Sequence, residues 1–301
     1  YLKEALENNV KMPCLGGIPS APEITIPERH LGLVTHDDHV LSDENVDKLA
    51  GLIEENIDIG RLLNSLADIQ RCKSDTDSIK KKFCVKIGVA RDNAFCFYYQ
   101  DNLDMLEARG AELIFFSPVK DHDLPWNLDG IYLGGGYPEL FAKQLAANSS
   151  LRDQIREKSI AGMPIYGECG GFMYLCRDIR VKDGKLYPMT GCFPFTTGMF
   201  PRLKSLGYRK IRLTENTIIG KCGRTLRGHE FHYSEITNFS KDMKTVYSVS
   251  ARAGRNETTE GYQSDRTLGS YVHLHFGSQP DAAGNFVEAC LDYNRERVEN
   301  S

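Results

Sequence analysis

The sequence lacks any long apolar run, since no window approaches the roughly 18 consecutive apolar residues of a transmembrane helix. It also lacks an excess of one charge: 37 Lys and Arg stand against 41 Asp and Glu, a formal net charge of −4. These absences argue against a membrane protein and against a broadly cationic nucleic-acid-binding protein. The N-terminus has neither a signal-peptide pattern nor an initial Met. We therefore expect Tyr1 to be a cut and a segment of the protein to lie upstream.

The nine cysteines form no C-x-x-C pair and show no Cys/His spacing typical of a zinc site. Their odd number and scattered positions argue against a secreted disulfide framework and predict a cytoplasmic protein. No G-x-x-x-x-G-K-[ST] phosphate loop occurs in the chain. We therefore expect no bound metal here, and we expect most of the cysteines to be small buried hydrophobic residues.

The chain of 301 residues divides into two predicted units. In residues 1–70, apolar side chains recur at helical spacing after Ser42 and Asp43, which form a suitable N-cap region. Residues 71–82 are polar without an apolar period and are typical of a linker. In residues 83–301, strands alternate with helices, which predicts an α/β fold with an open, mostly parallel sheet and helices on both faces. The expected strands are 84–90, 111–119, 128–140, 208–213 and 269–276, the expected helices are 102–110, 140–160 and 280–293, and a strand–turn–helix is expected at 163–176.

The stretch P-I-Y-G-E-C-G-G-F-M-Y-L places a cysteine among glycines where a strand meets a helix. This layout is typical of a nucleophile elbow, in which a strained turn presents the nucleophile and glycines avoid clashes. Cys169 lies at the turn, where the dipole of the next helix favours a thiolate. The N–H of Gly170 is then placed to hold a developing oxyanion. The alternative is a buried structural cysteine in a glycine-rich turn, and the flanking pattern favours the nucleophile.

Two further stretches complete the pattern. L-G-G-G-Y-P-E ends a strand with three glycines, so its backbone can approach a ligand closely, and Gly135 or Gly136 is predicted to supply the second oxyanion donor. G-S-Y-V-H-L-H-F places His273 and His275 two residues apart on a strand, so that both point to one face. A thiol nucleophile needs a base, and one of these histidines is predicted to be that base.

Together, the cysteine elbow, glycine loop and histidine strand resemble the triad-type (class I) glutamine amidotransferase domain of the CobB/CobQ type. L-G-Y-R, G-H-E-F-H-Y-S and the upstream I-P-E-R-H-L-G-L are similar to motifs of the cobyrinic acid a,c-diamide synthase family. The match covers about residues 84–293 and reaches into the first unit. It implies a flavodoxin-like amidotransferase domain in 83–301. It also implies that 1–70 are the C-terminal part of a P-loop, dethiobiotin synthetase-like ATP-binding domain, whose phosphate loop lies upstream.

The resemblance also implies roles for individual residues. Cys169 matches the family's nucleophile, and His273, the fifth residue counted from Gly269, matches its base. Two residues later the usual orienting glutamate is replaced by His275, which is an alternative base or orienter. Glu230 is a second candidate for the orienting role.

Four more residues are candidate substrate or nucleotide contacts. Arg202 and Arg209 are cations suited to an acceptor with many carboxylates, although exposed surface arginines are the simpler interpretation. Arg29 and His30 belong to the family-like motif near the end of the nucleotide-binding domain.

The implied function is that of the glutamine-hydrolysing portion of an ATP-dependent cobyrinate a,c-diamide synthase, a carbon–nitrogen ligase. Ammonia from glutamine is expected to reach the a and c carboxylates of a corrin precursor in cobalamin biosynthesis. ATP and Mg²⁺ are expected to bind in the upstream domain of the same protein. The expected partners are glutamine, a tetrapyrrole polycarboxylate and that upstream domain, and a homodimer is left open.

Three alternatives stay open from the sequence. The acceptor can be another tetrapyrrole, as in hydrogenobyrinate or Ni-sirohydrochlorin a,c-diamide synthase or in cobyric acid synthase. An unrelated cysteine-elbow α/β hydrolase shares the fold without needing glutamine. The third is a non-catalytic interaction module, against which the intact Cys169 and His273 argue.

Overall fold

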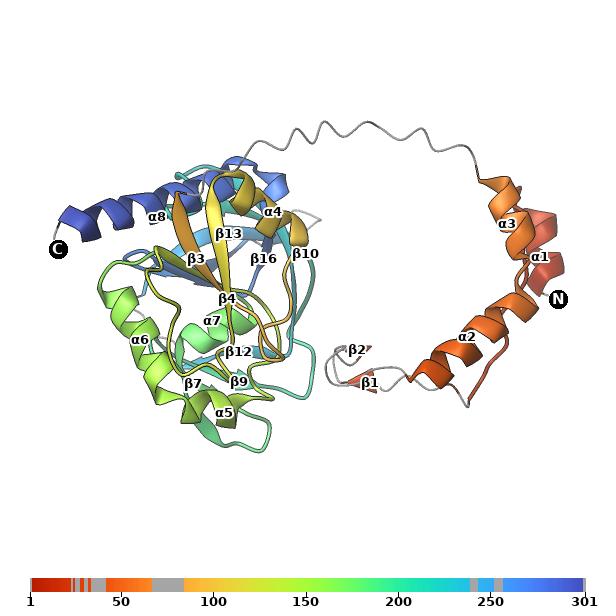
Figure 1. The fold of residues 1–301 in the computed structure, drawn as a ribbon, viewed down its shortest axis with the longest axis horizontal. Coiled ribbons are helices and arrows are strands. Elements are labelled where there is room, and N and C mark those ends of the chain that lie inside the picture. Colours follow the sequence, from red (N-terminus) through yellow and green to blue (C-terminus); the bar gives the residue numbers. More distant parts are fainter. Residues whose placement is uncertain are drawn as a thin grey trace. The chain divides into compact units, whose positions relative to one another are not determined.

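The computed structural model forms two compact units, Tyr1–Asp77 and Ser78–Ser301, and each is described by itself (Figure 1). The predicted linker 71–82 and His30 lie outside the described residues. The described residues are 2–22, 24, 28–29, 32–33, 42–66, 84–238, 243–251 and 257–299.

The described part of the first unit is mainly helical. Ser42 accepts a hydrogen bond from the backbone N–H of Asn45 at 3.2 Å and so caps a helix, as predicted. Arg29 lies in the first strand of a two-stranded antiparallel ladder. The elements are α1 (Leu2–Asn9), β1 (Glu28–Arg29), β2 (Gly32–Leu33), α2 (Asp43–Asn56) and α3 (Ile59–Ser65).

The second unit is built on a ten-stranded sheet with the order β16-β11-β10-β13-β14-β15-β6-β5-β3-β4. One half is parallel, as the alternation of strands and helices predicts: β15 (Thr267–Ser270), β6 (Ile165–Glu168), β5 (Gly130–Leu133), β3 (Val85–Ala90) and β4 (Ala111–Phe116). The other half is antiparallel: β16 (His273–His275), β11 (Thr225–His232), β10 (Ser205–Leu213), β13 (Thr245–Ala251) and β14 (Thr258–Ser264). The C-terminal half of the unit therefore extends the parallel sheet with the short strands expected after about residue 185.

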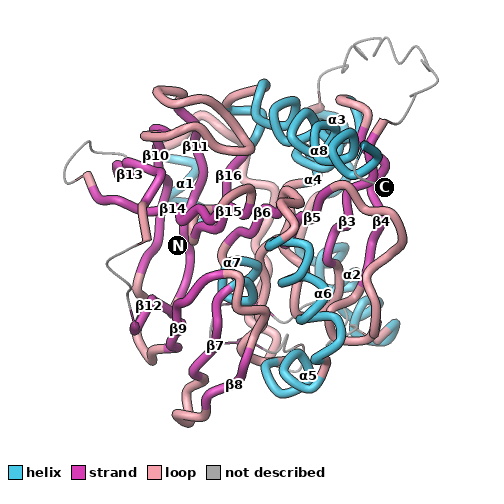
Figure 2. Tube along the Cα trace, turned by 90° about the vertical axis from the view of Figure 1, so that its left-hand side faces the viewer, coloured by secondary structure: helices cyan, strands magenta, loops and turns pink. Residues whose placement is uncertain are grey.

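Helices cover both faces of the parallel half, which confirms the predicted α/β class (Figures 1 and 2). Successive side chains of a strand point to opposite faces, so Ile131 packs in one core cluster with Leu151, and Tyr132 in the other with Phe286. Each such buried side chain stabilises the fold by about 1.5–3 kcal/mol. The helices are α4 (Gln100–Ala108) and α8 (Asp281–Glu299) on one face, and α5 (Ala142–Ala147), α6 (Ser149–Ile160) and α7 (Gly170–Leu175) on the other.

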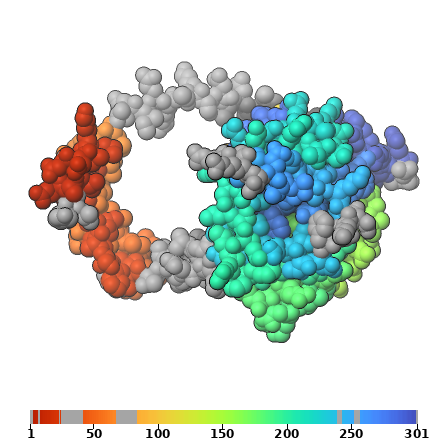
Figure 3. Space-filling view, turned by 180° about the vertical axis from the view of Figure 1, so that it is seen from behind, coloured from red at the N-terminus to blue at the C-terminus, as the bar shows by residue number. Residues whose placement is uncertain are grey.

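A second, four-stranded sheet has the order β12-β9-β7-β8. Its strands are β7 (Cys176–Arg180), β8 (Leu186–Pro188), β9 (Phe193–Met199) and β12 (Ser234–Asn238). Seen from behind, the C-terminal strand region, coloured cyan to blue, forms a broad surface of the second unit (Figure 3). Within the ranges given above, no helix is long and apolar enough to cross a membrane.

Two predicted elements are each divided in the structure. The helix expected at 140–160 breaks at Asn148, whose side-chain amide donates to the carbonyls of Pro118 at 2.9 Å and Asp121 at 2.7 Å. The strand expected at 269–276 breaks at Tyr271, so that β15 and β16 pair with different neighbours. The second break brings the chain from the parallel half of the sheet to β11, and it places the histidines described below.

Candidate functional site

Cys169 occupies the predicted nucleophile elbow between β6 and α7. Its φ of +49° and ψ of −103° are strained for a residue with a side chain. The flanking glycines are sterically required: a Cβ on Gly171 would lie 2.1 Å from the carbonyl oxygen of Leu133. The N–H of Cys169 donates to the carbonyl of Ser270 at 2.7 Å, so the elbow is tied to the end of β15.

The thiol of Cys169 is not a resting thiolate, contrary to the expectation from the helix terminus. Burial raises its pKa to about 12, with further increases from the charges of Glu139, Glu168 and Glu230. The N–H of Gly170 hydrogen-bonds the sulfur and lowers the pKa, but only partly offsets burial. Cys169 is only 7% exposed, and the effect of this burial on the thiol pKa is larger than the effect expected from the helix terminus. A base must therefore remove the proton during reaction.

The loop from Gly134 to Pro138 lies against the elbow and is fixed by backbone hydrogen bonds. The carbonyl of Gly134 accepts a hydrogen bond from the N–H of Gly171 at 2.9 Å, and its own N–H donates to the Tyr98 hydroxyl at 2.8 Å. Gly135 and Phe97 exchange two hydrogen bonds of 3.0 Å. The N–H of Gly135 is thus occupied, so of the two predicted alternatives, Gly135 and Gly136, the structure favours Gly136 as the oxyanion donor.

Gly136 is the remaining donor of this loop. Within the described ranges, no protein group accepts a hydrogen bond from its N–H. Its φ is +154°, and an added Cβ would lie 2.1 Å from the carbonyl oxygen of Ala94, so no other residue type fits at this position. A Cβ on Gly170 would lie 3.0 Å from the Gly136 nitrogen, so these two glycines are in contact. The structure therefore brings together Gly136 and Gly170, both predicted to bind the oxyanion.

His273 lies on β16 against the same loop. A Cβ on Gly135 would lie 2.3 Å from Cε1 of His273, so only glycine leaves room for the imidazole. The ring is 4% exposed, and in the described part of the chain no group hydrogen-bonds its Nδ1. Burial, followed by the neighbouring His229 and His232, lowers its pKa to about 3. His273 is therefore neutral and able to accept a proton, and it flanks the loop that also touches the cysteine elbow.

Glu168 is a residue that sequence reasoning missed, although it directly precedes Cys169. Its carboxylate accepts hydrogen bonds from the hydroxyls of Tyr166 at 2.6 Å and Tyr132 at 2.9 Å, and from the N–H of Leu274 at 2.8 Å. Burial raises its pKa to about 7. Glu168, which directly precedes the nucleophile, is thus hydrogen-bonded to Leu274, which directly follows the base. The signal available in the sequence was an acidic residue inside an otherwise apolar strand.

Glu260 holds the other end of the same segment and was also missed. It accepts hydrogen bonds from the N–H of Tyr271 at 2.8 Å and from the hydroxyl of Ser270. The Ser270 oxygen in turn accepts from the N–H of Val272 at 3.0 Å. Burial raises the pKa of Glu260 to about 7. The backbone leading to His273 is therefore held by side chains where the sheet ladder is interrupted.

The two predicted orienting residues, Glu230 and His275, have other partners in the structure. Glu230 accepts a hydrogen bond from Nε of Arg209 at 2.8 Å and one from the Ser205 hydroxyl. Two predicted site residues thus form a nearly buried ion pair with each other. His275 contacts Oδ2 of Asp101 through Nε2 at 3.2 Å, and Arg202 is exposed between β9 and β10. The side chain of Arg29 is not among those described.

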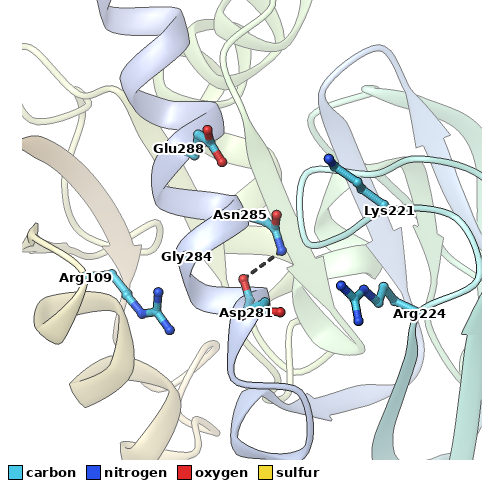
Figure 4. A pocket seen from close by; sticks show the side chains of 7 residues that line it. All are labelled: Arg109, Lys221, Arg224, Asp281, Gly284, Asn285 and Glu288. Atoms are coloured by element: carbon cyan, nitrogen blue, oxygen red, sulfur yellow. Dashed lines mark hydrogen bonds between the residues drawn. The ribbon is translucent and has the colours of Figure 1, made fainter.

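Two surface pockets are lined by residues other than Cys169 and His273. One, of about 340 Å³, is formed where Arg109, Lys221 and Arg224 face the first turns of α8 (Figure 4). The other, of about 740 Å³, lies on β10, β11 and β13 and includes Arg209. In the described ranges no group of three or more His, Cys, Asp or Glu residues is placed to hold a metal ion.

The second unit matches a known family over most of its length. Residues 86–281 match the CobB/CobQ-like glutamine amidotransferase domain. The chain belongs to this family. A Thermoplasma acidophilum protein described as a candidate GMP synthase component has a similar fold, with a TM-score of 0.51 and 19% identity over 72% of this chain and 98% of that one.

Curated relatives with higher identity match almost the whole chain. The cobyrinate a,c-diamide synthases of Leptospira interrogans and Syntrophotalea carbinolica are 40% and 41% identical, each over 96% of this chain. That of Caldanaerobacter subterraneus is 38% identical over 98% of this chain. The chain spans only 63%, 64% and 65% of the length of the Leptospira, Syntrophotalea and Caldanaerobacter proteins, respectively.

Proposed function

We propose that this amidotransferase-family chain hydrolyses glutamine and supplies the ammonia for a cobyrinate a,c-diamide synthase. The observation that carries the proposal is the joint placement of Cys169, His273 and the Gly136–Gly170 contact around one fixed loop. The elbow and loop geometry fits attack on a carboxamide, because it offers a nucleophile, a neutral base and two backbone donors. The names of the 38–41% identical relatives support the assignment.

In the proposed reaction, the Cys169 sulfur attacks the carboxamide carbon of glutamine as His273 accepts the thiol proton. The N–H groups of Gly136 and Gly170 stabilise the negative oxygen that develops on the former carbonyl. The carbon–nitrogen bond then breaks, the imidazolium returns its proton to the leaving nitrogen, and ammonia departs. Water hydrolyses the glutamyl thioester with His273 again acting as base, which regenerates the thiol and releases glutamate.

The acceptor belongs to the same proposal. We infer that ammonia is used to amidate the a and c carboxylates of a corrin precursor, in the reaction for which the relatives are named. ATP and Mg²⁺ would activate those carboxylates. Because no G-x-x-x-x-G-K-[ST] sequence occurs in the 301 residues, we propose that the phosphate loop belongs to another part of the protein and that residues 1–70 are the C-terminal part of the same ATP-binding domain.

The proposal is tested by measuring glutamate formation from glutamine by the purified chain and by its Cys169→Ser variant. We expect the variant to lose at least about 10³-fold in kcat, because a serine hydroxyl is a far weaker nucleophile without a stronger base. The melting temperature should change little, since the substitution replaces one small atom. Cys290→Ser is a matched control, because Cys290 is also buried but lies in α8. Wild-type glutamate release by the Cys169→Ser variant would refute the assignment.

A further inference from the structure

The geometry points to a role for His229, a residue that takes no part in the reaction proposed above. This inference rests on the proposed glutaminase function. We propose that His229 is a positioning residue that, held by Tyr99, stacks on His273 and fixes the plane of the catalytic imidazole in place of an orienting carboxylate.

Among the described residues, the buried Nδ1 of His273 has no orienting hydrogen bond. Glu230, one predicted orienter, is bound to Arg209, and His275, the other, contacts Asp101. Without a hydrogen bond at Nδ1, the orientation of this buried imidazole depends on the groups that pack against it.

Neighbouring rings supply this packing. His229 on β11 is the direct register partner of His273 on β16. The two imidazoles stack with centroids 4.7 Å apart and planes 10° from parallel. Phe97 meets the His273 ring edge-on at 4.8 Å and 74°, and Gly135 lies against Cε1. Contacts on the face and at the edges of the ring restrict its rotation.

His229 is itself anchored. Its Nδ1 is 2.7 Å from the hydroxyl of Tyr99, the residue that precedes α4. Phe97 contacts the His229 ring at 5.5 Å and 70°, so one aromatic side chain touches both imidazoles. The chain of contacts from α4 through Tyr99 and His229 thus ends on the proposed base.

The stack also has an electrostatic consequence. Burial lowers the pKa of His229, so two neutral rings face each other near neutral pH. Protonating both would place two cations 4.7 Å apart, which explains why His229 contributes to the lowered pKa of His273. Other ionisable groups around the pair are Glu230 and His232 on β11, Tyr208 opposite on β10, and Asp101 and His275 beyond Tyr99.

The experiment measures covalent labelling of Cys169 by 6-diazo-5-oxo-L-norleucine, a reactive glutamine analogue, followed on the Cys169 peptide by mass spectrometry between pH 4 and 9. His229→Asn removes the stacking ring. We expect labelling at pH 8 to slow by about tenfold or more. We also expect the acid limb of the profile to move upward in pH, because the pKa of a less enclosed His273 returns toward its ordinary value. His229→Phe keeps a flat ring but loses the hydrogen bond to Tyr99, so its labelling rate should rise above that of His229→Asn only to the level of Tyr99→Phe, described below.

Two further variants keep the test decisive. Tyr99→Phe removes only a hydroxyl and should slow labelling several-fold even if His229→Asn proves too unstable. His122→Asn, at an exposed histidine between β4 and β5, is the control and should label as wild type. Wild-type rates and an unmoved acid limb in folded His229→Asn, or an unchanged rate in Tyr99→Phe, would overturn the inference. Failure of the wild-type chain itself to label would instead refute the proposed function.

Discussion

Gly135→Ala tests the placement of the base most directly. The added Cβ would lie 2.3 Å from Cε1 of His273, 3.1 Å from Nδ1 and 3.3 Å from Nε2. An ordinary carbon–carbon contact needs about 3.5 Å, so the imidazole or the loop must move by roughly 1 Å. Gly135 does not have a positive φ, so alanine adds no backbone strain and the clash is the whole perturbation.

The magnitude follows from these distances. A misplacement of about 1 Å in a catalytic group costs about 10²-fold in rate. Overpacking of a buried site costs about 1–3 kcal/mol, which is less than the 5–15 kcal/mol by which a domain is typically stable. We therefore expect a folded variant whose glutamine-hydrolysis kcat is about a hundredfold lower.

The assay is glutamate formation at saturating glutamine, paired with thermal unfolding of the same preparation. Gly51→Ala is the matched control, because no heavy atom lies within 4 Å of the added Cβ and Gly51 is inside α2. It should keep the wild-type rate and gain about 0.5–1 kcal/mol of stability. If folded Gly135→Ala kept the wild-type kcat, then either His273 is not the base or its position is not set by this loop.

Two further predictions concern the buried carboxylates. Glu168→Gln leaves a buried hydroxyl or N–H without its acceptor, so we expect a loss of about 1–3 kcal/mol in the free energy of unfolding. We also expect slower labelling of Cys169. An unchanged labelling rate would contradict the link between Glu168 and β16. For Glu260, the folded-state pKa is about 7, raised from 4.5. The contribution of the protonated Glu260 carboxyl to the free energy of unfolding is therefore fully present below pH 4.5 and lost as pH rises through 7. In denaturant titrations, the stability of wild type relative to Glu260→Gln should fall by up to roughly 3 kcal/mol between pH 4.5 and 8. A pH-independent difference would show that Glu260 titrates normally.

Local patterns were sufficient to predict much of the fold. Apolar β-branched runs between turn residues indicated the parallel strands, because both faces of such a strand are buried. The G-E-C-G-G turn was recognisable because a strained nucleophile needs small neighbours on both sides. Cys169 and Gly136 lie where such reasoning placed them.

Contacts between distant residues were not predictable in this way. The N–H of Gly135 donates to the carbonyl of Phe97, and Glu230 accepts a hydrogen bond from Arg209. Both contacts depend on how strands and loops are aligned in the fold, which the spacing of residues in the sequence does not show. The high thiol pKa of Cys169 depends on burial by the surrounding chain, whereas the helix terminus that suggested a thiolate is a local feature. For the same reason Glu168, whose partners Tyr132 and Leu274 lie far along the sequence, received no role.

The segment from Ser270 to Leu274 owes its shape to two carboxylates, Glu168 and Glu260, at a point where the ladder of the sheet is broken. A strand in a sheet ladder can be shifted only together with its neighbours. The backbone path of a segment that is held by hydrogen bonds to side chains can be changed by substituting those side chains, while the sequence of the segment stays the same. Changes at positions 168 and 260 would thus alter the path of Tyr271 and Val272, which lead from β15 into β16, while His273 keeps its pairing with His229 on β11.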